Sequence, residues 1–323
     1  AGAPGARPPA ARFDTSLTTQ LSLAANLRPT ANPLTNATPT LSLVALARSE
    51  QTPRALRAQA AALAHRRSAL ANADARAILR GTPAEITAGL PPIVMVLRAV
   101  EAAPGSLAAA TAIAGLLRQA ASPADFAANA RFFKDDIAAL QNAPDQAAAL
   151  AFARAAIMTG DNALAQRLIA SARLAGVSEV ALAPLDIALV AATAPRGEQG
   201  LVAMQRRIDA GGASLARAAA RDVGILTALG APTNGVVQNF LLANAPQGGA
   251  RADAGAMLAL TAAVERGAMG EGALLAVVAA GEGGLARLDA DSLARIIRAL
   301  RDLRLDADAR RFAVEALLAG APG

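Results

Sequence analysis

The sequence predicts an all-α protein, a solenoid of antiparallel helical hairpins that follows an extended, proline-rich N-terminal arm. The apolar residues are mostly Ala and Leu, with 2% aromatic residues and no Trp or Tyr, which favours close helix packing over a β-sandwich. Residues 147–176 form the pattern of two amphipathic helices broken at residues 159–161. The same frame fits residues 291–320 without a gap, and such a self-match indicates a helical repeat.

Composition sets limits on the protein's class. The chain has 323 residues and 54% hydrophobic content, which is ample for a core, and the lack of Cys excludes a disulfide framework or a thiolate metal site.

The longest apolar stretches are far below the ~20 residues that span a bilayer, so we expect no transmembrane segment. The start at Ala1 without Met fits a mature exported protein or a fragment. We therefore expect a periplasmic or envelope-associated protein, with the cytoplasm as the alternative.

The net charge of +6 is concentrated near the N-terminus, where residues 1–80 contain ten Arg and three acidic residues. Lys134 is the only lysine, and together with the abundant Ala, Gly and Pro this indicates the coding bias of a GC-rich genome. Single-stranded nucleic acid binding usually adds stacking aromatic side chains, and Phe13 is the only one in this region. We expect no nucleic-acid partner.

Residues 1–40 are dense in Pro, Thr and Asn, which predicts an extended arm interrupted by one short helix within residues 17–27. Ordering such a segment costs roughly 1–2 kcal/mol per residue, so either the chain's own helices or a neighbouring subunit must hold it. Leu17, Leu21 and Leu27 could supply an apolar anchor. We expect the arm to dock on a partner through them.

Residues 41–143 are expected to form an N-terminal helical region whose helices begin at prolines. The prolines predict helices from Pro53 to about Asn72, from Pro83, over 93–102, over 106–120, and from Pro123 onwards.

The last of these helices carries three of the seven Phe residues. Phe126, Phe133, Ile137 and Leu140 follow each other at intervals of seven, four and three residues, which places them on one helical face. We expect this face to be packed core rather than a ligand pocket.

Residues 144–323 are expected to form the hairpin array. Glycine and proline clusters separate the hairpins, since glycine supplies left-handed helix ends and proline cannot continue a helix. Asp145, Asp161, Ser178 and Asp289 stand where short oxygen-bearing side chains cap helix N-termini. The expected hairpins are 145–176, 178–212, 213–244, 250–283 and 289–320.

The hairpins at 147–176 and 291–320 resemble tetratricopeptide or Sel1-like repeats. In that family two small residues seven apart in the second helix let the helices approach, and Ala165/Ala172 and Ala309/Ala316 match this. Phe152 and Ile296 match the bulky inward residue of the first helix. The chain departs from the family in lacking the large aromatic near the start, the first-helix glycine and the proline after the second helix. The resemblance covers residues 145–320 and implies partner binding rather than a reaction.

The sequence offers no recognisable catalytic, cofactor or metal constellation. His65 is the only histidine, and Asp135 and Asp136 are adjacent, so their carboxylates point apart on a helix. The glycine-rich segments lack the Lys-Ser/Thr of a phosphate loop. Arg206 and Arg207 could line a concave partner-binding face. The alternative is a structural role, because Asp209 and Asp222 lie close enough in sequence to pair with them.

These observations lead us to expect a non-enzymatic protein–protein interaction scaffold, or a structural subunit of a larger assembly, set in a bacterial envelope. One alternative is a regulatory adaptor that binds a peptide in a concave groove. The other is a non-catalytic relative of the superhelical domains of peptidoglycan-lytic enzymes. Those enzymes use a catalytic Glu followed by Ser, and none of the nine Glu residues here precedes Ser.

Overall fold

The computed structural model describes residues 11–35, 37–140, 143–193, 195–246, 248–281 and 284–320. The chain divides into two compact units, residues 1–142 and 143–323, and each is described by itself. Within the described ranges every regular element is helical, with seventeen α-helices and one short 3₁₀ helix. The predicted all-α class is confirmed.

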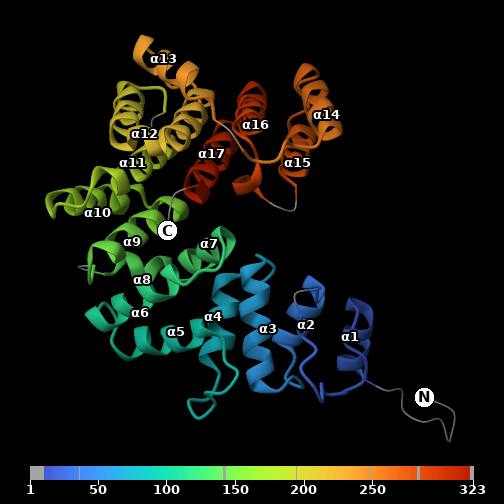
Figure 1. The fold of residues 1–323 in the computed structure, drawn as a ribbon. Coiled ribbons are helices and arrows are strands. Elements are labelled where there is room, and N and C mark those ends of the chain that lie inside the picture. Colours follow the sequence, from blue (N-terminus) through green and yellow to red (C-terminus); the bar gives the residue numbers. More distant parts are fainter. Residues whose placement is uncertain are drawn as a thin grey trace, which may run out of the picture. The chain divides into compact units, whose positions relative to one another are not determined.

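Unit 1 contains eight helices, and those that follow each other in the chain pack as neighbours (Figure 1). Helix α7 also contacts α3, α4 and α6, which closes the unit. The bounds are α1 Ser16–Ala24, α2 Thr40–Arg48, α3 Arg54–Arg66, α4 Asn72–Arg80, α5 Pro92–Ala102, α6 Leu107–Arg118, α7 Pro123–Phe132 and α8 Lys134–Ala138.

The core of unit 1 forms around the aromatic residues at the α7–α8 junction. Phe132 and Phe133 are fully buried, and their ring centroids lie 4.8 Å apart at a steep angle. The His65 ring meets Phe132 edge-on at 5.4 Å. Arg76 stacks over Phe132 and donates to both carboxylate oxygens of Asp136, at 2.8 and 2.9 Å. Phe126, Phe133 and Ile137 are buried as expected, and Leu140 is half-buried. The single helix expected to carry them is two helices, because the chain leaves helical geometry at Phe133, between α7 and α8.

Two other predicted helices in this unit were wrong. The helix expected from Pro53 to Asn72 ends at Arg66, because Ser68 takes a positive φ of 58° and a new helix starts four residues later. Pro83 opens no helix. The Arg98 guanidinium instead donates to the carbonyl oxygens of Pro83 and Ile86, at 2.7 and 3.4 Å, and so satisfies a loop that glycines and prolines keep out of helical geometry.

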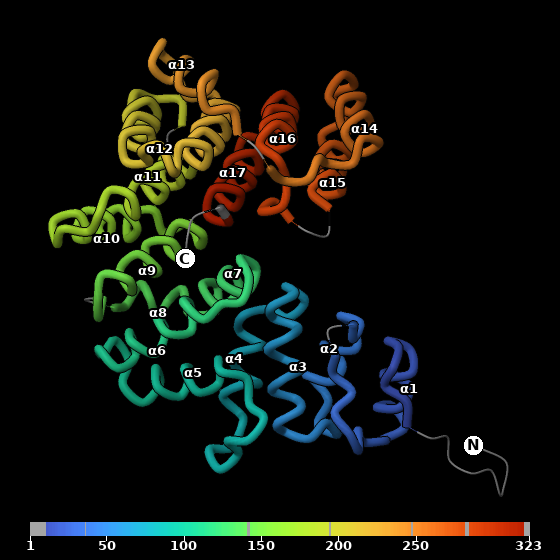
Figure 2. Tube along the Cα trace, in the orientation of Figure 1, coloured from blue at the N-terminus to red at the C-terminus, as the bar shows by residue number. Residues whose placement is uncertain are grey.

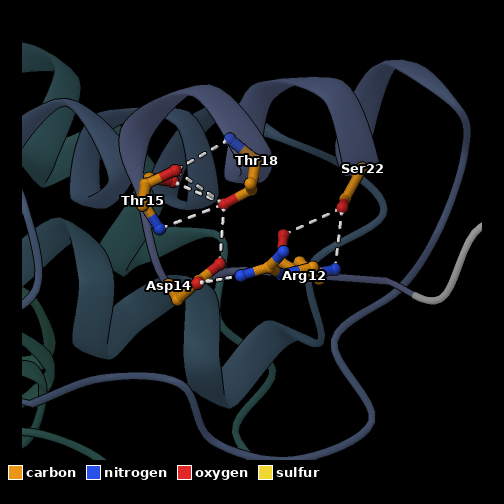
Figure 3. Close-up of polar contacts among 5 residues, drawn as sticks. All are labelled: Arg12, Asp14, Thr15, Thr18 and Ser22. Atoms are coloured by element: carbon orange, nitrogen blue, oxygen red, sulfur yellow. Dashed lines mark hydrogen bonds and ion pairs between the residues drawn. The ribbon is translucent and has the colours of Figure 1, made fainter.

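The helix expected inside the arm is α1, and its N-terminus is closed by a local hydrogen-bond network (Figure 3). The Thr15 hydroxyl accepts from the Thr18 backbone N–H at 3.1 Å. Asp14 accepts from the Thr18 hydroxyl at 2.9 Å and from Arg12 at 2.7 Å, and these donors hold the pKa of Asp14 below its ordinary value. This network fixes where the chain enters α1.

The described part of the arm contacts its own unit. Thr19 on α1 shares a buried hydrogen bond of 3.2 Å with Ser42 on α2. Arg67, just after α3, donates to the Thr38 carbonyl oxygen at 2.6 Å. Residues 1–10 of the predicted arm lie outside the described residues. The described part of the arm is therefore bonded to α2 and to the segment after α3.

Unit 2 contains nine α-helices and the short η1. Their bounds are α9 Gln146–Thr159, α10 Asn162–Leu174, α11 Glu179–Thr193, α12 Glu198–Ala228, α13 Gly235–Ala243, α14 Ala254–Glu265, α15 Met269–Ala280, η1 Leu285–Arg287, α16 Ala290–Asp302 and α17 Asp306–Gly320. The break expected at residues 211–212 is a kink inside α12, where Gly212 has φ 53° and ψ −169°. The predicted hairpins 178–212 and 213–244 therefore share one helix.

The order of the hairpins in space differs from their order in the chain. Helix α17 packs on α9, α11 and α12, and α16 packs on α12, so the last hairpin lies against the second (Figures 1 and 2). Helices α14 and α15 pack on each other and on α16. The hairpin α14/α15 is consequently at one end of unit 2, although α16 and α17 follow it in sequence. In a strictly linear solenoid each repeat contacts only its sequence neighbours.

Arginine side chains hold the last turns of α17 inside the unit. Arg154 of α9 donates to the Leu318 carbonyl oxygen at 2.6 Å, and Arg221 of α12 donates to the Ala316 carbonyl oxygen at 3.1 Å. Leu318 is among the last four residues of α17, whose carbonyls have no partner within a helix, and Ala316 comes directly before these four. Both residues are fully buried, so Arg154 satisfies a free carbonyl that water does not reach, and Arg221 adds a donor beside it.

The starts of α14 and α16 are tied together by backbone hydrogen bonds. The Ala250 N–H donates to the Arg287 carbonyl at 2.6 Å, and the Asp289 N–H donates back to the Ala250 carbonyl at 2.9 Å. The Ala252 N–H also donates to the Ser292 hydroxyl at 3.0 Å. Gly249 makes this approach possible, because a Cβ there would lie 2.6 Å from the Asp289 nitrogen.

We predict that Gly249→Ala destabilises unit 2 much more than Gly248→Ala. Both glycines have φ near +90°, so both substitutions carry the strain of a left-handed alanine, but an added Cβ at Gly248 meets no atom within 4 Å. The difference isolates the clash with Asp289, and we expect at least ~1 kcal/mol between the variants. Urea unfolding followed by circular dichroism measures it, and equal midpoints for the two variants would contradict the prediction.

Candidate interaction surface

The structure separates the predicted anchor residues of the arm. Leu17 and Leu21 are 66% and 60% exposed and lie one turn apart on α1, so they form a small apolar patch. Leu27, beyond the end of α1, is half-buried. The first two are available to a partner, and the third contributes less.

Arg206 and Arg207, the other predicted pair, do not share a surface. Arg207 is 3% exposed and its Nε donates to the Asp222 carboxylate at 2.8 Å. Arg206 is exposed and lies 3.6 Å from Asp186. Burial removes Arg207 from any partner-facing position, and the alternative of a structural role applies to it.

The Arg207–Asp222 pair is a buried charge pair between the two halves of α12. Burial raises the pKa of the Asp222 carboxyl, while Arg207 and Arg221 favour its ionised form. Arg221 lies 3.8 Å from the other oxygen of this carboxylate. The pair therefore links the segments on either side of the kink at Gly212.

A second charge cluster joins α10, α11 and α12. Arg173 contacts Asp186 at 2.5 Å and Glu179 at 2.6 Å. The hydrogen bond from Arg173 holds the pKa of Glu179 below its ordinary value, whereas burial raises the pKa of Asp186. These side chains satisfy one another, and we assign the cluster to the packing of the first two hairpins.

The exposed apolar side chains gather on α13, α14 and α15. Of the fifteen large apolar side chains that are exposed in the described ranges, seven belong to these three helices. They are Val236, Leu242, Leu258, Met269, Leu274, Val277 and Val278. The charged residues within these helices are Glu265 and Glu271, each near a helix end. Single exposed apolar residues are ordinary, but five of these seven side chains lie on α14 and α15, which pack on each other, and such a concentration indicates an interaction surface.

The clearest part of this surface is one face of α15, which we call the α15 stripe: Leu274, Val277 and Val278. These side chains are 71%, 69% and 59% exposed and lie on adjacent turns. Ala276 and Ala279 on the opposite face are buried, so α15 is apolar on both sides. A helix that is apolar all round is normally buried all round, and the α15 stripe has no covering element among the described residues.

Beside it lies the α14/α16 groove, a cavity of about 660 Å³ between α14 and α16. Its α14 wall is mostly apolar and its α16 wall is charged. The groove is lined chiefly by Met257, Leu258, Thr261 and Val264 of α14, by Asp291, Arg295, Arg298 and Asp302 of α16, and by Arg251 ahead of α14.

Unit 1 has a cavity of about 470 Å³ among α3, α5, α6 and α7. Its main polar groups are already bonded within the protein. The His65 Nε2 lies 3.2 Å from the Ala128 carbonyl oxygen, and Arg66 pairs with Asp125 at 3.1 Å. This cavity therefore offers few free groups that would orient a ligand.

The comparisons with known proteins do not place this chain in a family. Within the described ranges no helix is both long and apolar enough to cross a bilayer, and no group of His, Cys, Asp or Glu side chains is arranged to hold a metal ion. No family model, curated protein or solved structure matches this chain. The tetratricopeptide or Sel1-like resemblance stays a prediction.

Sequence reasoning missed both the α15 stripe and the α14/α16 groove. A signal for the stripe was present, because residues 272–281 contain no charged side chain. The groove had no such signal, since its two walls are far apart in the chain and meet only through tertiary packing.

We predict that Arg207→Ala destabilises unit 2 by about 3 kcal/mol or more, because removing the closer partner of a buried ion pair leaves the Asp222 carboxylate with only Arg221, at 3.8 Å. The adjacent variant Arg206→Ala is the matched control and should cost under ~1 kcal/mol, because Arg206 is exposed and Asp186 keeps its shorter contact with Arg173. Urea unfolding of both variants measures the difference. If Arg207→Ala left the unfolding midpoint unchanged, the structural role assigned to Arg207 would be contradicted.

Proposed function

We propose that the protein is a non-enzymatic interaction scaffold or structural subunit, and that the α15 stripe is covered by a partner protein. The observation that carries the proposal is the stripe itself. Leu274, Val277 and Val278 present adjoining apolar side chains on a helix that is otherwise packed into unit 2. Fully burying such a side chain contributes ~1.5–3 kcal/mol, which is enough to sustain a stable contact.

The composition of the surface favours a protein over a lipid partner. Helices that lie in a membrane interface combine an apolar face with a polar face rich in Lys and Arg. Helices α13, α14 and α15 contain neither residue. Arg266, between α14 and α15, pairs with Glu271 at 2.8 Å and does not form such a basic face. An apolar surface with few charges is typical of the core of a protein–protein contact.

The place of α14/α15 supports a scaffold within a fixed assembly. If unit 2 is a solenoid of hairpins, as the sequence predicts, its terminal hairpin should carry a polar outer face to remain soluble. The α14/α15 hairpin is terminal in space and carries an apolar one. A constitutive partner that continues the stack supplies the missing cover.

The α14/α16 groove favours a second candidate function, the regulatory adaptor. An adaptor would bind one short segment reversibly and remain monomeric otherwise. The stripe and the groove are distinct surfaces, so the two candidates can be tested separately.

We predict that Leu274→Gln/Val277→Gln/Val278→Gln weakens partner binding by roughly 30–150-fold, as expected when ~2–3 kcal/mol of contact is lost. Affinity purification from the native source with quantitative mass spectrometry identifies the partner, and titration with that purified partner measures the change. The replaced side chains are exposed, so the helical circular dichroism signal should not change.

The matched control is Leu174→Gln, which alters an equally apolar side chain that is 91% exposed on α10. This variant should keep full affinity. Equal binding by the triple variant and the control would show that the α15 stripe is not the contact surface.

A further inference from the structure

We propose that the α14/α16 groove binds an amphipathic helical segment of a partner protein whose apolar side chains are flanked by carboxylates. This inference rests on the proposed function, because it names the chemistry of the partner that an interaction protein would hold here.

The α14 wall provides the apolar half of the site. Met257, Thr261 and Val264 follow at intervals of four and three residues, so they line one face of the helix, with Leu258 73% exposed beside them. A ridge of apolar side chains at the same spacing on a partner helix would fit between them. Methionine adapts to irregular side-chain shapes, which suits a surface that must accept a ridge.

The charged residues of the α16 wall, together with Arg251 at the start of the groove, determine which side chains should flank the apolar ridge of a partner helix. Arg295 already pairs with Asp291 at 2.9 Å. In the part of the chain that the structure describes, the side chains of Arg251 and Arg298 make no ion pair or hydrogen bond. Two guanidinium groups beside an apolar wall therefore lack anions, and each can take a carboxylate in a bidentate contact.

Charges of both signs occur at each end of the groove. Arg251 stands at the end where α14 and α16 both begin, near Asp291 in the first turn of α16, and the positive ends of two helix dipoles meet there. Asp302 is the last residue of α16, and Arg298 precedes it by one helical turn. A partner helix should therefore place one carboxylate beside Arg251 and another beside Arg298.

The same features disfavour nucleic acid in the groove. A phosphate backbone would carry negative charge past Asp291 and Asp302 as well as past the arginines. No aromatic side chain lines the cavity to stack on a base. The groove combines charges of both signs with an aliphatic wall, which fits a partner helix that carries both apolar and charged side chains.

The two walls of the groove are fixed relative to each other by backbone hydrogen bonds at their start and by packing against α15. The backbone bonds between residues 250 and 287–289 fix the distance between the two walls at their start. Helix α15 packs against both walls, where Gly272 lets Leu303 approach. A site whose walls are already in place loses less conformational freedom on binding.

The test is selection from a phage-displayed library of random 16-residue peptides on three forms of the full chain: wild type, Arg298→Glu and Arg167→Glu. Arg167 is exposed on α10 and provides a charge reversal of the same kind away from the groove. We expect wild type and Arg167→Glu to enrich amphipathic peptides that contain Asp or Glu beside Leu or Met. The Arg298→Glu form should enrich Lys or Arg in place of the acidic residues.

Fluorescence anisotropy with the best wild-type peptide gives the magnitude. We expect Arg298→Glu to weaken binding at least tenfold and Arg167→Glu to change it less than twofold. Enrichment of basic peptides by wild type, the absence of any enrichment, or equal affinity for wild type and Arg298→Glu would overturn the proposal. Circular dichroism on each form verifies that the exposed substitutions leave the helices intact.

The α15 stripe variant separates this inference from the proposed function. Loss of the native partner by the stripe variant, with no acidic peptides selected by wild type, refutes the groove proposal and leaves the scaffold proposal standing. Selection of acidic peptides that depend on Arg298, with the native partner retained by the stripe variant, refutes the stripe as contact surface and supports the groove.

Discussion

Burial of α17 is the constraint on which the arrangement of unit 2 depends. Six of its side chains, including those of Ala309, Ala313 and Leu318, are buried, and it contacts α9, α11 and α12 at once. A helix end can enter a core only if its free carbonyls find donors. Arg154 of α9 provides such a donor for Leu318, and Arg221 of α12 donates to the carbonyl of Ala316 just before it. The last hairpin of the chain is thereby fixed against the second hairpin.

The position of the other surfaces follows from this placement. With α16 and α17 against α11 and α12, the preceding hairpin α14/α15 can pack only on the free side of α16. That leaves the α15 stripe without a covering helix and opens the groove between α14 and α16. The same displacement brings Arg298 of α16 beside the apolar wall of α14. Both candidate binding surfaces therefore result from the packing of α16 and α17 against α11 and α12.

The two hairpins that match in sequence show how strongly placement governs exposure. Ala165 and Ala309 are both fully buried, and Phe152 and Ile296 are buried as the repeat resemblance implies. Leu174 is 91% exposed, whereas its equivalent Leu318 is fully buried. Both hairpins consist of two helices, but Leu174 is the last residue of α10, whereas α17 continues to Gly320. The difference arises because α17 is surrounded by other helices and α10 is not.

The sequence by itself determined the elements that depend on local interactions. Amphipathic spacing, glycine breaks and N-cap residues could be recognised in the sequence because their partners lie within a few residues. The side chains of Asp145 and Asp161, for example, accept from backbone N–H groups at 2.7 and 3.1 Å. The burial of Phe126, Phe133 and Ile137 was predictable from their spacing, but the break at Phe133 that divides the expected helix into α7 and α8 was not.

Only the tertiary structure decided the order of hairpins in space, the burial of Arg207 and the exposure of the α15 stripe. Arg206 and Arg207 are adjacent and chemically identical in the sequence. They separate because successive residues of a helix point about 100° apart, and the neighbouring helix segment that carries Asp222 covers one of them. Which face of a helix is covered depends on contacts between residues distant in the chain, and local spacing carries no record of them.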